Sequence, residues 1–141
     1  MECRSGVSGH TLIFTFTNNV TSGNATVTDG AGSVSGSPIF SGKTMTVSLT
    51  SVTDAQKITV TLSNVTDAFS QILPNTNVSM NVLLGDTNGS KVVNSSDVGQ
   101  TRMQSGSPLG ETNFRADVTV NGTINSSDTG SVKSRSGAGV Q

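Results

Sequence analysis

The sequence predicts a mainly β fold, an antiparallel sandwich of two sheets, followed by a small helical module. Residues 1–84 alternate apolar and polar side chains with a period of two, which is typical of half-buried strands. Clusters of Gly, Ser, Asn and Asp separate these runs at short intervals and predict turns. From residue 85 onward the alternation stops and a polar segment of twelve residues occurs twice. We therefore expect two domains, residues 1–84 and residues 85–141.

Five alternating runs mark the expected strands. In the first run Leu12, Phe14 and Phe16 face one side, and threonines face the other. The later runs direct these residues inward: Ala25 and Val27; Met45, Val47 and Leu49; Ile58, Val60 and Leu62; Val78, Met80, Val82 and Leu84. Turns are predicted at residues 21–24, 29–32, 41–43 and 73–75. About six or seven short strands at this spacing favour a sandwich of immunoglobulin-like type, with Phe69 in a loop that caps its core.

Two features of this first part allow more than one interpretation. The serine and threonine faces of the strands are either plain solvated surface or a ladder for binding. Cys3 is the only cysteine, so an internal disulfide is excluded. The alternation predicts Cys3 as a small buried residue on a first strand, and the alternatives are a free thiol or a bridge between molecules.

The duplicated segment occupies residues 86–97 and returns 31 residues later at 117–128. Both copies carry oxygen-bearing side chains at positions 1, 3, 5, 9 and 12, which is the ligand pattern of an EF-hand calcium loop. Calcium takes about six to eight oxygen ligands, so a short loop must gather several of them. The predicted ligands, with position 7 counted for its backbone carbonyl, are Asp86, Asn88, Ser90, Val92, Asn94 and Asp97 in loop 1, and Asp117, Thr119, Asn121, Thr123, Asn125 and Asp128 in loop 2. The alternative, two polar turns without a metal, does not explain why the oxygen positions stay in phase.

The two loops resemble those of the dockerin family of calcium-binding modules, in which each loop is followed by one helix. The resemblance covers residues 85–137 and implies two bound calcium ions, helices over 96–104 and 127–135, and a cohesin-like protein partner. It also implies that the partner binds the surface just after the loops. The matching positions are Ser95, Ser96 and Arg102 in one copy and Ser126, Ser127 and Lys133 in the other. The serine pairs have an alternative role as helix caps, and Asn94 can also cap the first helix.

Three positions depart from the family pattern. Ser90 stands at position 5, where an Asp is usual, and Lys91 at position 6, where the sharp turn favours Gly. Loop 2 keeps its glycine but has Thr119 at position 3. Each loop therefore offers two carboxylates, which predicts a modest affinity suited to a calcium-rich extracellular medium. The aliphatic residues at position 8, Val93 and Ile124, are expected to pair the two loops side by side.

The remaining composition argues against several functions. The net charge of −1 disfavours nucleic acid as a partner, and no apolar run is long enough to predict a membrane span. His10 is the only histidine, and the aspartates outside the loops, Asp29, Asp54 and Asp67, stand in turn-like contexts. No nucleophile and base can be assembled from these residues, so we expect no enzyme.

The sequence therefore predicts a non-catalytic, calcium-binding module that attaches one protein to another outside the cell. The expected partner is a cohesin-like domain or further copies of the chain, and the expected setting is a secreted or cell-surface protein of a bacterium. The alternative is a structural subunit of a calcium-stabilised filament, adhesin or surface layer, because low charge and abundant Ser, Thr and Asn suit that role too. A carbohydrate-binding sandwich is disfavoured because Trp and Tyr, which stack on sugar rings, are absent.

Overall fold

The computed structural model describes residues 1–6 and 9–141, and the chain is mainly β with two antiparallel sheets. Its contacts divide the chain into two compact units. The sheet unit comprises Gly6–Thr53 and Ile58–Ser79, and the helical unit comprises Met1–Ser5, Asp54–Lys57 and Met80–Gln141. The helical unit thus contains three segments of the first 84 residues, 1–5, 54–57 and 80–84, in addition to the residues from 85 onward.

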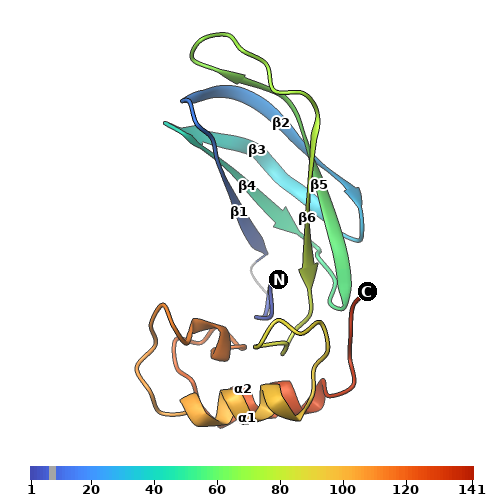
Figure 1. Cartoon of the computed structure of the whole chain (residues 1–141), viewed down its shortest axis with the longest axis vertical. Helices are drawn as coiled ribbons and strands as arrows, with labels where there is room; N and C mark the ends of the chain where they lie inside the picture. Colours follow the sequence, from blue (N-terminus) through green and yellow to red (C-terminus); the bar gives the residue numbers. More distant parts are fainter. Residues whose placement is uncertain (7–8) are drawn as a thin grey trace. The chain divides into compact units, whose positions relative to one another are not determined.

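The six named strands form two three-stranded sheets, with the orders β1-β4-β3 and β2-β5-β6 (Figure 1). The central strands are therefore β4 and β5, and β2 of one sheet contacts β3 and β4 of the other. The strands span these residues: β1 His10–Thr15, β2 Val20–Asp29, β3 Ser33–Ser41, β4 Thr44–Thr50, β5 Gln56–Asp67 and β6 Thr76–Val82.

The two central strands supply most of the buried side chains of the sheet unit. Their inward residues are at most 2% exposed, and they are Met45, Val47 and Leu49 in β4 and Ile58, Val60 and Leu62 in β5. The predicted alternation is confirmed in β4. In β5 the predicted inward residues are buried, but Thr59, which was expected to face outward, is buried too. In β5 the phase changes after Asn64, whose φ of 52° lies in the left-handed region, so that Val65 is also buried.

The turn predicted at residues 21–24 is wrong, because these residues lie inside β2. The pairing of β2 with β5 shifts register between Val20 and Ser22 and again between Ser22 and Asn24. A Cβ atom on Gly23 would lie 2.9 Å from Cγ2 of Val65. The glycine therefore permits close approach of two strands at a bulge, instead of marking a turn.

Strand β3 was not among the predicted runs. Its sequence is rich in serine and contains Gly36 and Pro38, which normally argue against a strand. The structure accommodates them at a sheet edge, and the register with β4 shifts between Ser35 and Ile39. A proline that lacks an N–H group is tolerated at such a position because no ladder hydrogen bond is lost there.

The loop after β5 is organised by Asp67 and not by Phe69. Phe69 is 73% exposed, so the prediction that it caps the core is wrong. The Asp67 carboxylate accepts hydrogen bonds from the backbone N–H groups of Phe69 and Gln71 and from the amide of Asn18. The bond from Asn18, with the two backbone bonds, lowers the pKa of Asp67.

The helical unit has helices over both segments that the duplication predicts. Helix α1 spans Ser95–Gln104, the short 3₁₀ helix η1 spans Phe114–Ala116, and α2 spans Ser126–Ser134. Helices α1 and α2 lie alongside each other (Figure 1). Among the residues that the structure describes, no helix has the length and apolar character needed to cross a membrane.

A small apolar core holds this unit together. It consists of Leu83, Val93, Val118 and Val132, each fully buried. The alternation of β6 ends at Val82, so Leu83 is the fully buried residue and Leu84, which was expected to face inward, is only partly buried. Phe114, at the start of η1, is 41% exposed.

Substitution of a central-strand residue should therefore differ sharply from substitution of the exposed loop aromatic. We expect Leu49→Ala to lower the free energy of unfolding by roughly 2–5 kcal/mol, because it removes buried methyl groups and leaves a cavity. Phe69→Ala should change it by less than about 0.5 kcal/mol, because the ring is mostly in water. Urea unfolding followed by circular dichroism measures both. Equal losses in the two variants would contradict the placement of Phe69.

Candidate metal centre

Loop 1 is built around the side chain of its first residue. The Asp86 carboxylate is fully buried and accepts hydrogen bonds from the backbone N–H groups of Ser90 at 2.9 Å and Lys91 at 2.8 Å. Its two oxygens thus fix the backbone of Ser90 and Lys91, loop positions 5 and 6, close to position 1. The same N–H of Ser90 also donates to Oδ1 of Asn88, at 2.8 Å, so oxygens of positions 1 and 3 converge on one hydrogen atom.

Loop 2 repeats this arrangement at the equivalent positions. The Asp117 carboxylate, which is 4% exposed, accepts from the N–H groups of Asn121 at 3.1 Å and Gly122 at 3.0 Å. The position-1 carboxylate therefore makes the same two backbone bonds in both loops. Two segments with different residues at most positions have folded into one loop geometry.

The last residue of each loop closes it from the other end. Asp97 is fully buried and accepts from the N–H groups of Asn88 at 3.1 Å and Asn94 at 2.9 Å. Position 12 of each loop is also the third residue of the following helix, where its carboxylate completes a capping box with the asparagine at position 9.

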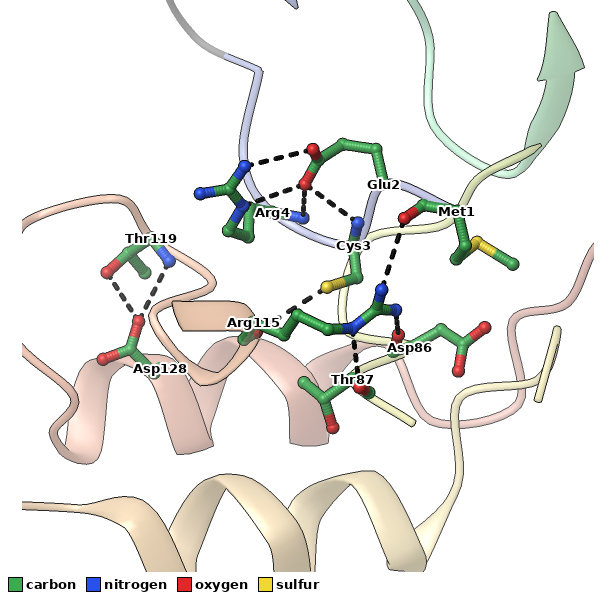
Figure 2. Close-up of polar contacts among 9 residues, drawn as sticks. All are labelled: Met1, Glu2, Cys3, Arg4, Asp86, Thr87, Arg115, Thr119 and Asp128. Atoms are coloured by element: carbon green, nitrogen blue, oxygen red, sulfur yellow. Dashed lines mark hydrogen bonds and ion pairs between the residues drawn. The ribbon is translucent and has the colours of Figure 1, made fainter. Parts of the chain in front are cut away.

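Asp128 is its counterpart in loop 2. It is fully buried and accepts from the N–H groups of Thr119 and Asn125, both at 2.9 Å, and from the hydroxyl of Thr119 at 2.8 Å. Figure 2 shows the two bonds from Thr119. In both loops, one carboxylate therefore ties positions 3, 9 and 12 together.

The other predicted ligand groups lie within the same hydrogen-bonded loops. The Ser90 hydroxyl donates to the carbonyl oxygen of Val92, and Oδ1 of Asn121 accepts from both the N–H and the hydroxyl of Thr123. Oδ1 of Asn94 caps α1 through the N–H of Ser96, and Oδ1 of Asn125 caps α2 through the N–H of Ser127. The caps are thus the asparagines at position 9, not the serines at positions 10 and 11.

The backbone has the same unusual conformation at positions 4 and 6 of both loops. At position 4, φ is 77° in Gly89 and 57° in Val120, and at position 6 it is 69° in Lys91 and 84° in Gly122. These values lie in the left-handed region, which glycine enters without strain and a β-branched residue enters at a cost. Lys91 therefore adopts the left-handed conformation that Gly122 has at the same position of loop 2, and the two loops keep one shape.

The oxygen inventory fits calcium better than a softer metal. Within residues 1–6 and 9–141, no three His, Cys, Asp or Glu side chains form a cluster that could hold a metal ion. Each loop instead combines two carboxylates with amide, hydroxyl and carbonyl oxygens. Such neutral oxygens are ordinary calcium ligands, whereas zinc and copper favour nitrogen and sulfur.

The position-8 residues, Val93 and Ile124, are buried, and their backbone groups bond to the segments that follow the helices. The backbone of Val93 exchanges hydrogen bonds with the segment after α2, through Gly137 N–H at 2.8 Å and the carbonyl oxygen of Ala138 at 2.9 Å. The carbonyl oxygen of Ile124 accepts from Gly106 N–H, after α1, at 2.9 Å. Gly106 and Gly137 occupy equivalent positions of the two repeats. Each loop is therefore joined to the end of the other repeat's helix, in a nearly twofold arrangement.

All six predicted partner-binding residues are exposed. They are Ser95, Ser96, Arg102, Ser126, Ser127 and Lys133. A largely apolar hollow of about 690 Å³ lies between the two repeats, and Ser95, Arg102 and Lys133 are among its lining residues. The structure thus brings the two cationic side chains, one from each helix, to a single depression.

Arg115 is a residue of this site that sequence reasoning missed. It precedes loop 2, yet its guanidinium donates to the backbone carbonyl oxygens of Asp86 at 3.0 Å and Thr87 at 2.9 Å in loop 1 (Figure 2). Asp54 was interpreted as a turn residue, but it accepts from the N–H of Leu84 and forms an ion pair with Arg135. The partners of Arg115 and Asp54 lie far away in the sequence, so no local sequence pattern predicts these contacts.

Three comparisons with known proteins were made, and no family model, curated protein or solved structure matches this chain.

Val120, in loop 2, is a β-branched residue in the left-handed conformation, with a φ of 57°. Val120→Gly should raise the stability of the helical unit by about 1 kcal/mol, because glycine adopts the left-handed conformation without a Cβ clash. Gly122→Ala should lower it by about 1 kcal/mol, for the opposite reason. Thermal unfolding in saturating calcium, with the wild type in the same buffer, measures both changes. Loss of stability in the Val120→Gly variant would contradict the loop conformation.

Proposed function

We propose that the helical unit is a dockerin-like module that binds two calcium ions and attaches the chain to a protein partner. The sheet unit, in this proposal, is an immunoglobulin-like sandwich that carries the module outside the cell. The role is non-catalytic, because the four loop carboxylates are committed to shaping and charging the two loops.

One observation carries the proposal: among the described residues, four buried carboxylates take no part in a salt bridge. Asp86, Asp97, Asp117 and Asp128 are at most 4% exposed. In the part of the chain that the structure describes, the two salt bridges are Arg4 with Glu2 and Arg135 with Asp54, so neither involves a loop carboxylate. Buried charges are normally paired or bound to metal, since removal of an ion from water costs several kcal/mol. Backbone N–H groups satisfy part of this demand, and a divalent cation in each loop satisfies the rest.

The attachment surface is supported by the near-twofold relation of the repeats. Arg102 and Lys133 are equivalent in the two repeats and line the same hollow. A surface of this kind presents similar groups in two orientations related by a half-turn. A cohesin-like domain or a second copy of the chain is the proposed partner, and the mass of the purified protein in calcium, measured by light scattering, distinguishes a self-associating chain from a monomer.

Removal of one carboxylate should remove one calcium site. We expect two ions per chain by isothermal titration calorimetry, with dissociation constants on the order of 10⁻⁴ M because each loop has only two charges. Asp97→Asn and Asp128→Asn should each leave one ion, and the double variant none, since asparagine keeps the shape but not the charge. Asp29→Asn, at an exposed position outside the loops, is the matched control. Two ions bound by the double variant would refute the ligand assignment.

Calcium removal should loosen the helical unit selectively. Helices α1 and α2 contain Gly99 and Gly130 and few strong helix formers, so their order should depend on the loaded loops. We expect a chelator to accelerate tryptic cleavage after Lys91 and Arg102 by about tenfold or more. Cleavage after Lys43, between β3 and β4, should not change and serves as an internal control. Equal protection of Arg102 with and without calcium would count against the proposal.

A further inference from the structure

The first residues of the chain form part of the helical unit. Glu2 makes a parallel bridge with Val82, and the N–H of Glu2 donates to the carbonyl oxygen of Asn81 at 2.9 Å. The carbonyl oxygens of Glu2 and Cys3 then accept from Leu83 N–H and Gly85 N–H, both at 2.9 Å. Residues 2 and 3 thus lie as a short added strand beside residues 81–85, which lead directly into loop 1.

Arg115 joins this N-terminal segment to loop 1. Besides its bonds to the Asp86 and Thr87 carbonyl oxygens, its guanidinium donates to the carbonyl oxygen of Met1 at 3.4 Å. The carbonyl oxygen of Arg115 lies 3.6 Å from the Cys3 sulfur and accepts its S–H. Figure 2 shows that this one arginine connects Met1 and Cys3 with the first two positions of loop 1.

The segment also contacts loop 2. The N–H of Ser5 donates to the carbonyl oxygen of Val118, position 2 of that loop, at 2.7 Å. The Arg4 guanidinium lies over the Phe114 ring, 5.1 Å from its centre, and pairs with Glu2. The segment is thus bonded directly to loop 2 through Ser5 and is linked to loop 1 through Arg115.

We propose that Met1–Ser5 is a calcium-gated latch, docked on the helical unit when the loops are loaded and released when calcium leaves. The proposal rests on the proposed function of the two loops. Loaded loops hold the carbonyl groups of Asp86, Thr87 and Val118 where Arg115 and Ser5 reach them. Emptied loops lose that order, and the segment keeps only its backbone bonds to residues 81–85. Because coupling between two binding events is reciprocal, the docked latch also strengthens calcium binding.

Cys3 reports the state of the latch. It is 1% exposed in the docked segment, and burial raises the pKa of its thiol to about 11. Only the thiolate attacks a disulfide reagent, so the docked residue reacts slowly near pH 8. As the chain has one cysteine, every thiol signal comes from this position.

The test measures the reaction of Cys3 with an aromatic disulfide reagent at pH 8, in saturating calcium and in chelator, with calorimetry in parallel. We expect chelation to accelerate the reaction about tenfold or more, since release restores an exposed thiol of ordinary pKa. If two ions bind and the rate is the same in both conditions, the latch is refuted and the calcium module stands. If no ion binds, the proposed function fails and the latch fails with it.

Arg115→Met separates the latch from general loosening of the module. In saturating calcium this variant should still bind two ions, more weakly than the wild type, and should label Cys3 about tenfold faster, because hydrogen bonds from a charged donor are lost. Lys43→Met, which removes an exposed cation between β3 and β4, is the matched control and should label at the wild-type rate. An unchanged rate in Arg115→Met would overturn the role of Arg115. If this variant does not fold, the wild-type comparison with and without calcium decides the proposal.

Discussion

Each loop of the helical unit depends on two buried carboxylates, at its first and last positions, that accept hydrogen bonds from backbone N–H groups. The position-1 carboxylates, Asp86 and Asp117, accept hydrogen bonds from the N–H groups of positions 5 and 6. The position-12 carboxylates, Asp97 and Asp128, lie in the first turn of the next helix and accept from the N–H groups of positions 3 and 9. The same four side chains therefore shape the loops and concentrate negative charge, and two of them, Asp97 and Asp128, also complete the capping boxes of the helices. Loop, helix and candidate site cannot vary independently, because they share these groups.

The two repeats share the same loop backbone, but the side chains buried inside them differ. Val118 and Val132 are fully buried apolar residues, whereas their equivalents in the first repeat are the buried Thr87 and Thr101. The Thr101 hydroxyl donates to the carbonyl oxygen of Asp97, and the Thr87 hydroxyl to the side chain of Gln100, so neither is left unsatisfied. A hydrogen-bonded threonine replaces a valine of similar size at little cost, provided its hydroxyl finds a partner inside the repeat.

Local patterns predicted what local forces determine. The alternation in β4 and β5 was predictable because one face of each strand is buried, and the loops because their oxygen positions repeat. Strand β3 was missed because pairing with β4 overrides the poor strand preference of Gly36 and Pro38. Arg115 was missed because its partners lie 28 or more residues away in sequence. Contacts of that kind arise from tertiary packing, which a single sequence does not display.

The two units draw their stability from different sources. In the sheet unit, apolar side chains of the central strands are removed from water, a contribution that hardly depends on ionic conditions. The helical unit has a small apolar core, and it buries four of the nine acidic residues of the chain. Its folding free energy must therefore include whatever neutralises those charges, since binding to a site absent from the unfolded chain is itself folding free energy. Under the proposed function, the calcium concentration around the protein therefore sets the order of the helices, the loops and the N-terminal segment together.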